Sequence, residues 1–344
     1  MNAFRRPLAA CMAAAAAFAT LAPSHAADTW PTKPVRLVVA FPAGAPGDIV
    51  SRLMQPALQK ALGQPVVVDN KPGAGGNIGM QEVARATDGH TVLVGPDTML
   101  TINPHLYRKL AIRPMEDLVP VTQLAAFSQE LVCFPGAGIK TLPELLAAAR
   151  AKPMSYASGG PGVPGHMAME MLLADAGVQM QHVPYRGPSP AMQDVMGGMV
   201  PCGFLASPTV GPIIRDGKLV AIAVSGSKRL GSQPTVPTVA QAGVKGYDAS
   251  FAEMMAMPRA TPPAVVARLQ AEVAKALAAP ELRERLATMD LEVVANTPED
   301  AARRMLDAAA GLGPDDLVLC LVSGGGSALM SLPAPGIGFE EKRA

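Results

Sequence analysis

The sequence predicts an α/β protein with two lobes and a ligand-binding cleft between them. Segments typical of buried strands alternate with small-residue turns and amphipathic helices between residues 34 and 96, and the alternation returns between residues 141 and 177. A long apolar stretch from Leu118 to Phe134 separates the two series, so we expect strands that cross between the lobes. With 344 residues, 49% hydrophobic and 17% charged, the chain can bury a core in each lobe.

The N-terminal residues have the features of an export signal. Arg5 and Arg6 form a positive n-region, residues 8–21 are apolar, and a small-x-small cleavage signal ends at Ala26. We therefore expect export and cleavage near Ala26. The twin arginines leave both the general and the twin-arginine export route open, and a lipoprotein-type motif at Cys11 lacks a full apolar segment before it.

The first series of elements begins after Pro34. VRLVVAFP predicts a buried strand, AGAPGD a turn, and IVSRLMQPALQKALG a helix that ends at Gly63. A second strand (PVVVDN), a glycine turn (KPGAGGN), a helix (IGMQEVARA) and a third strand (TVLVGP) follow. This order predicts a mostly parallel sheet with helices on both faces, and such sheets bind ligands at the carboxyl ends of their strands.

The second series repeats the pattern with different residues. Thr141 and Glu144 predict a capping box for the helix TLPELLAAARA. MSYAS predicts a strand, GGPGVPG a turn, and HMAMEMLLADAG a helix. Further on, Thr261 and Pro262 predict the start of a helix over 263–278. One face of that helix is apolar and carries Val266, Leu269, Val273 and Leu277.

Charge, cysteines and motifs exclude several function classes. Loss of Arg5 and Arg6 takes the formal net charge from +1 to −1, and no basic stripe appears, so nucleic acid is not an expected partner. The cysteines after the signal form no CxxC pair and the histidines lack ligand spacing, so no metal site is expected. HExxH, GxSxG and GxxxxGK[ST] are absent, and the glycines of residues 73–79 miss the dinucleotide spacing by one position, so we expect no cofactor.

Two small-residue loops are the candidate binding elements. PAGAPGD follows the first strand, and ASGGPGVPGH lies in the second series. Both loops lead into helix N-termini and expose backbone N–H groups, an arrangement that suits a carboxylate. A role as simple tight turns fits these loops equally well at this point.

Ordered motifs carry a resemblance to a known family. FPAGAPGDIVSRL, GQPVVVDNKPGAGGNIGMQEVARATDGHTVLVG, YASGGPGVPGHMAMEML and VPYRGPSPAMQDVMGGMV resemble, in this order, the Bug-type receptors of tripartite tricarboxylate transporters, over about residues 30–304. The resemblance implies a two-lobe, type II-like periplasmic binding protein and not an enzyme. It implies a monomer that captures a small organic di- or tricarboxylate and hands it to a membrane permease. Residues 27–125 and 249–304 would form lobe 1, and residues 126–248 lobe 2.

The resemblance also implies the ligand-binding residues. Receptors of this family hold a carboxylate largely through backbone amides and bridging water, and water can carry such contacts at little loss of affinity. Carried over by motif, the contacts come from the loop after the first strand, a loop after the third strand, the matching loop of lobe 2 and the YRG segment. They are Phe41, Ala43, Gly44 and Asp48; Thr98; Ser158, Gly159 and His166; and Tyr185, Arg186 and Gly187.

Some positions keep two interpretations or depart from the family. Asp48 could contact the ligand or cap the following helix, and Arg186 could pair with a carboxylate ligand or form a surface salt bridge. Gly47 stands where the family has Thr or Ser, and Pro201-Cys202 stands where it commonly has an aspartate after Val. Both departures bear on ligand identity.

The last residues resemble a different family. SGGGSAL followed by LPAPG, within residues 305–344, is similar to a short internal segment of glycerate 2-kinases, which are also called hydroxypyruvate reductases. Residues 323–327 could form an anion-binding nest. The segment is too short for catalysis because it lacks metal ligands and a positioned acceptor. We therefore expect a gene fusion, with either a working receptor or a nonfunctional remnant as the product.

Overall fold

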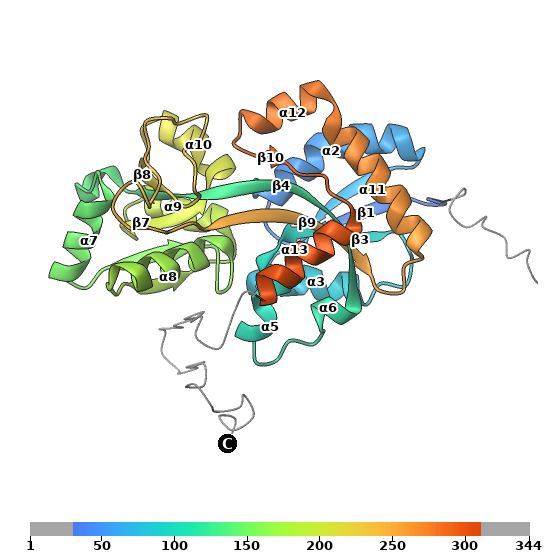
Figure 1. Ribbon diagram of the computed structural model, residues 1–344, viewed down its shortest axis with the longest axis horizontal. Coiled ribbons are helices and arrows are strands. Elements are labelled where there is room, and N and C mark those ends of the chain that lie inside the picture. Colours follow the sequence, from blue (N-terminus) through green and yellow to red (C-terminus); the bar gives the residue numbers. More distant parts are fainter. Residues whose placement is uncertain (1–29, 311–344) are drawn as a thin grey trace, which may run out of the picture.

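The computed structural model describes residues 30–310, which form two α/β lobes (Figure 1). The strands are β1 (Val35–Val39), β2 (Val66–Asn70), β3 (Thr91–Pro96), β4 (Leu118–Cys133), β5 (Ser155–Ser158), β6 (Gln181–Pro184), β7 (Cys202–Ala206), β8 (Val220–Val224), β9 (Ser250–Pro258) and β10 (Glu292–Val293). The helices are α2 (Pro46–Leu62), α3 (Asn77–Ala84), α4 (Thr98–Thr101), α5 (Asn103–Leu106), α6 (Pro114–Asp117), α7 (Leu142–Ala151), α8 (Pro164–Ala176), α9 (Pro188–Met196), α10 (Ser207–Arg215), α11 (Pro263–Ala278), α12 (Pro280–Ala287) and α13 (Pro298–Ala310), with 3-10 turns η3 (Ala74–Gly76) and η4 (Pro135–Ala137).

One mixed sheet runs through both lobes in the order β2-β1-β3-β9-β4-β7-β5-β6, and β8 and β10 also pair with β4. We call the part with β1 to β3, α2, α3 and α11 the first lobe, and the part with β5 to β8 and α7 to α10 the second lobe. Residues 118–128 of β4 pair with β9, and residues 129–133 pair with β7. The chain therefore crosses to the second lobe on β4 and returns on β9, as the apolar stretch from Leu118 predicted (Figure 1).

The prediction of a mostly parallel sheet holds only for the outer strands. β1 is parallel to β2 and β3, and β5 is parallel to β6 and β7. At the centre, β9 is antiparallel to β3 and β4, and β4 is antiparallel to β7 and β8. A chain that leaves one lobe on one strand and returns on its neighbour must run in opposite directions on the two, which makes the centre antiparallel.

Local sequence signals set the helix ends. α2 begins at Pro46, earlier than the predicted Ile49, because proline suits the first helical position, where an N–H group has no helical partner. It ends at Gly63 in the left-handed conformation, with φ at 65°. The capping box of α7 is confirmed: the Thr141 hydroxyl accepts from the Glu144 N–H at 3.3 Å, and the Glu144 carboxylate accepts from the backbone N–H of Lys140, one residue before the cap.

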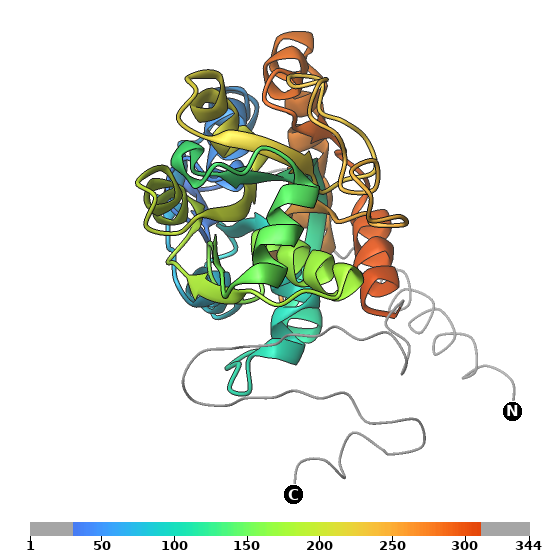
Figure 2. The same cartoon turned by 90° about the vertical axis from the view of Figure 1, so that its left-hand side faces the viewer.

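The C-terminal helices close the first lobe. The predicted apolar face of α11 is buried, and α11 packs against α2 and β4. α13 packs against β4 and α4, with Ala301 fully buried. Figure 2 shows these helices, coloured orange to red, along one side of the molecule. Within residues 30–310, no helix combines the length and the apolar character needed to cross a membrane.

Candidate functional site

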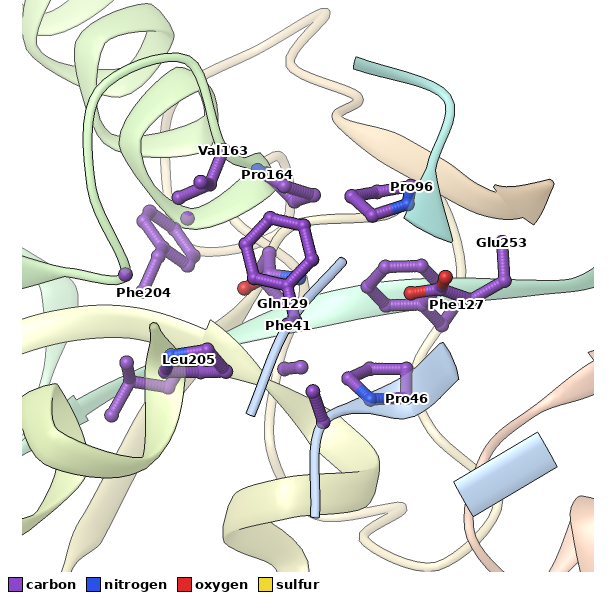
Figure 3. Close-up of a pocket in the computed structure, with 15 residues that line it drawn as sticks. Phe41, Pro46, Pro96, Phe127, Gln129, Val163, Pro164, Phe204, Leu205 and Glu253 are labelled. Carbon is purple, nitrogen blue, oxygen red and sulfur yellow. The ribbon is translucent and has the colours of Figure 1, made fainter. Parts of the chain in front are cut away.

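A pocket lies between the lobes, where the loops after β1 and β5 face each other (Figure 3). It contains about 390 Å³ of space between protein atoms, part of it open to solvent. Most of its lining is apolar, and none of the lining side chains is cationic. The lining residues are Phe41, Ala45, Pro46, Pro96, Phe127, Gln129, Gly159, Val163, Pro164, Gly165, Pro188, Phe204, Leu205, Ala206 and Glu253.

The two loops have the same backbone turn. In the first, AGAPGD, Gly44 has φ at 80° and its N–H donates to the Asp48 carboxylate at 3.0 Å. In the second, PGVPGH, Gly162 has φ at 77° and its N–H donates to Nδ1 of His166 at 3.1 Å. Each turn is followed by a proline at the first helical position, and each directs the first turn of a helix, α2 or α8, at the pocket. The N–H groups of a first helical turn have no acceptor within the helix, so both ends favour an anion.

Asp48 is a buried carboxylate whose negative charge is stabilised by hydrogen-bond donors of the protein itself. Its oxygens accept from Arg52 Nε at 2.9 Å and from the Asn70 amide at 3.0 Å, as well as from Gly44. Burial alone would raise the pKa of Asp48, but the bonds from Arg52, Gly44 and Asn70 outweigh it and lower the pKa. Asp48 is therefore charged at neutral pH, and this charge occupies the first turn of α2.

His166 takes the equivalent position in α8 but carries no charge. It is fully buried and stacks on His182, with ring centroids 4.1 Å apart. Burial, together with the neighbouring His182, lowers the pKa of His166 to about 3. Since Nδ1 accepts from Gly162, the proton of the neutral ring is assigned to Nε2. The first turn of α8 therefore has no negative side chain at this position.

Glu253 of β9 is the ionisable side chain that lines the first-lobe end of the pocket. It is 2% exposed, and its Oε2 has no hydrogen-bond partner among the described residues. A Cβ at Gly47 would lie 2.8 Å from this oxygen, so the glycine gives the carboxyl group its room. Burial first, and then the Asp97 carboxylate, raise the pKa of Glu253 to about 8, against the lowering effect of the Gly47 N–H.

Hydrogen bonds join the lobes across the cleft. Thr209 of α10 donates its hydroxyl to the Gly44 carbonyl at 3.0 Å, and Ser189 of α9 donates to the Ala43 carbonyl at 3.3 Å. On the other side of the pocket, Tyr107 donates to the Pro161 carbonyl at 3.1 Å. The described structure is therefore a closed arrangement of the lobes around the pocket.

A model of the tripartite tricarboxylate transporter family receptors matches residues 50–314. The chain belongs to this family. It is 33% identical over 287 residues to the protein BugT of Bordetella pertussis, which covers 82% of this chain and 88% of BugT. Among solved structures, R. palustris Rpa4515 with adipate is 30% identical with a TM-score of 0.79, over 82% of this chain and 95% of that one. MatC of Rhodopseudomonas palustris with bound malate is 30% identical with a TM-score of 0.78, over 82% of this chain and 98% of that one.

The family match confirms the predicted resemblance and the predicted role of a solute-binding receptor with two lobes. A segment of the receptor also matches the second predicted family. A putative hydroxypyruvate reductase of Agrobacterium vitis is 42% identical over 67 residues, which is 20% of this chain and 17% of that protein. The predicted tail beyond residue 310, its glycine-rich loop and the export signal before residue 30 lie outside the described residues.

The receptor brings some predicted contact residues to the pocket. Phe41 and Gly159 line it, and Ala43 and Gly44 sit at its rim, in contact with the second lobe. An adjoining pocket is lined by Tyr185, Arg186 and Gly187 together with Phe41 and η3. Arg186 is exposed there and forms no ion pair with any described residue, while the Tyr185 hydroxyl donates to Asp194 at 2.6 Å.

Other predicted contact residues lie behind the pocket. Ser158 is fully buried and bonded to Nε2 of His182 at 2.6 Å, inside the second lobe. His166 and Asp48 support the two turns through their bonds to Gly162 and Gly44. Thr98 is buried in α4 and lines neither pocket. A direct role of these residues in ligand binding stays a prediction.

Several pocket residues that were not predicted come from the central strands of the sheet. Phe127 and Gln129 come from β4, Phe204 from β7 and Glu253 from β9, so only the folded sheet brings them together. One sequence signal was available: Glu253 is the single charged residue in the apolar run SFAEMMAMP. A lone acid in an apolar run is costly to bury unless it has a function or a partner.

The predicted departure at Pro201-Cys202 lies away from the pocket. Cys202 faces Cys133 across the β4–β7 ladder, and both thiols are buried and free. The neighbouring Cys133 thiol and burial raise the pKa of Cys202 well above its usual value. Neither cysteine lines the pocket.

Proposed function

We propose that this receptor binds a small organic carboxylate in the pocket between its lobes. The observation that carries the proposal is the pair of matched turns, which direct the first turns of α2 and α8 at one apolar pocket. Two solved relatives of the same fold are named with adipate and with malate, which supports the same ligand class. The apolar walls suit the carbon skeleton of such an acid, and the helix ends suit its anionic group.

We also propose the cellular role that the resemblance implies. The exported receptor is a periplasmic monomer that presents its bound acid to a membrane permease, after cleavage near Ala26. Lobe 1, of residues 27–125 and 249–304, and lobe 2, of residues 126–248, close around the ligand by a hinge motion. The bonds of Thr209 and Ser189 across the cleft stabilise the closed arrangement of the lobes.

The binding proposal is tested by thermal unfolding of the mature chain with a panel of acids. The panel contains succinate, malate, tartrate, citrate, adipate and glycerate, with chloride at equal ionic strength as the control. A ligand at one hundred times its Kd stabilises the folded state by about 2.7 kcal/mol, so the midpoint should rise by several degrees. Calorimetry then confirms one site per chain. A cooperative transition that no acid shifts, together with no heat of binding, would reject the proposal.

A further inference from the structure

The two ends of the pocket differ in charge. At the second-lobe end, the first turn of α8 carries the neutral His166, so its partial positive charge is available. At the first-lobe end, the first turn of α2 already faces two carboxyl groups, those of Asp48 and Glu253. A single ligand carboxylate is therefore favoured at α8, while α2 offers it no free positive charge.

Glu253 requires a partner when it is ionised. Its Oε2 is unbonded in the described chain, and the lining residues near it in Figure 3, Phe127 and Pro96, are apolar. The charged groups around it are few. Asp97, at the end of β3, repels a charge on Glu253, and Arg52 of α2 is already paired with Asp48. From β4, the polar side chain that lines the pocket is the uncharged Gln129.

The missing cation can come from the ligand. An ammonium group at the first-lobe end would meet a buried carboxylate in an apolar pocket, where a charge-assisted hydrogen bond is stronger than in water. A second ligand carboxylate at the same place would face the carboxyl groups of Glu253 and Asp97. It would bind only if these groups stayed protonated, because their negative charges would otherwise repel it.

We propose that the ligand of this receptor is an amino acid in the broad sense: its carboxylate lies at the N-terminus of α8 and its ammonium group is bound by Glu253. The inference rests on the proposed function, because it assigns the second polar group of the carboxylate ligand. It makes Glu253 a specificity-determining residue, and Gly47 the position that gives its carboxyl group room.

Binding is then coupled to a proton. In the free receptor, the pKa of Glu253 is raised to about 8, so the group is mostly protonated at pH 7. An ammonium ligand stabilises the carboxylate and releases up to about one proton per molecule bound at pH 7 from the Glu253–Asp97 pair, because burial also raises the pKa of Asp97, to about 7. A dicarboxylate leaves the proton in place. The number of protons released is obtained from binding enthalpies in buffers of different ionisation enthalpy.

Matched pairs of ligands test the assignment. Succinate is compared with 4-aminobutanoate, adipate with 6-aminohexanoate, and 4-methylpentanoate with leucine. Each pair keeps one carboxylate and a similar skeleton, and adds the ammonium group in place of a second carboxylate or a hydrogen. We expect the wild-type receptor to bind the ammonium member of at least one pair at least tenfold more tightly, with release of close to one proton.

Glu253→Gln is the decisive variant because it keeps the size of the side chain and removes its charge. We expect it to weaken binding of the ammonium ligand at least tenfold and to abolish proton release, while the other members of the pairs bind as before. Glu281→Gln on α12, an exposed acid far from the pocket, is the matched control and should change nothing. Unfolding midpoints of both variants show whether they fold.

The outcomes separate the two proposals. Tighter binding of dicarboxylates by the wild type, or an unchanged preference in a folded Glu253→Gln variant, overturns the role of Glu253 and leaves carboxylate binding intact. No saturable binding of any acid, with or without an amine, overturns the proposed function and this inference with it.

Discussion

The turn of residues 43–48 and the turn of residues 161–166 share one backbone conformation but differ in the charge of the side chain that each turn binds. Both place a left-handed glycine before a proline–glycine pair, and both donate that glycine's N–H to the side chain at the third helical position. In the first lobe this side chain is the charged Asp48, and in the second it is the neutral His166. The comparison shows that the fold fixes where the two helix ends face the pocket, while the side chain at the third helical position sets the charge within each turn.

The glycines at the second helical position give the largest expected difference between the two turns. A Cβ at Gly165 would lie 2.1 Å from the backbone oxygen of Phe204, whereas a Cβ at Gly47 would lie 2.8 Å from the end of the Glu253 side chain. Gly165→Ala should therefore lower the free energy of unfolding by about 3 kcal/mol, from overpacking that only a strand shift relieves. Gly47→Ala is the matched control and should lower it by less than about 1 kcal/mol, since alanine also favours the helix. Urea unfolding measures both, and equal losses would show that the two turns are packed alike.

The second expected difference between the lobes is the loss of stability in acid. The folded pKa of His166 is about 3 and that of His182 about 4, both below the ordinary histidine value. Because the pKa of each histidine is lower in the folded chain than in the unfolded chain, the unfolded chain binds more protons than the folded chain at pH values between these two pKa values. The stabilising contribution is therefore complete above about pH 6.5 and is lost as the pH falls toward 4, by about 3 kcal/mol for each histidine.

His166→Asn tests this window because the amide oxygen can still accept from Gly162 but does not titrate. The variant should lose less stability than wild type between pH 6.5 and 4, as measured by urea unfolding at each pH. His105→Asn is the control, since this histidine is exposed. A variant that follows the wild-type curve would mean that His166 is not held neutral.

Sequence reasoning predicted the backbone of both turns better than their surroundings. Glycine and proline act locally, so PAGAPGD and ASGGPGVPGH identified two helix ends suited to an anion. Burial is not local: Ser158 and His166 are fully buried in the second lobe, where Ser158 bonds to His182 of β6, and their predicted contact with the ligand stays a prediction. Glu253, Phe127 and Phe204 reach the pocket from three strands, and only the antiparallel centre of the sheet places them there.

Asp48 should respond to acid in a lower range than His166. Its folded pKa lies below the ordinary aspartate value, so its contribution is complete above about pH 4 and is lost only as the pH falls through the folded pKa. Asp48→Asn should cost about 1 to 2 kcal/mol at pH 7, because Arg52 loses its charged partner while an amide oxygen still accepts from Gly44. Asp216→Asn, an exposed acid, is the control. A loss at pH 7 equal to that of the control would mean that the Asp48 charge does not stabilise the turn.

The smallest expected effect concerns the bond that joins the first turn to the second lobe. Thr209→Val keeps the shape of the side chain and removes the hydroxyl that donates to Gly44. When the lobes are open, water replaces this bond, so the unfolding midpoint without ligand should stay unchanged. Ligand affinity should fall two- to tenfold, the equivalent of one hydrogen bond of about 0.5 to 1.5 kcal/mol. Thr288→Val removes a hydroxyl bond to a carbonyl within the first lobe and is the control. Equal affinity of both variants would show that the bond from Thr209 to the first turn does not contribute to closure around the ligand.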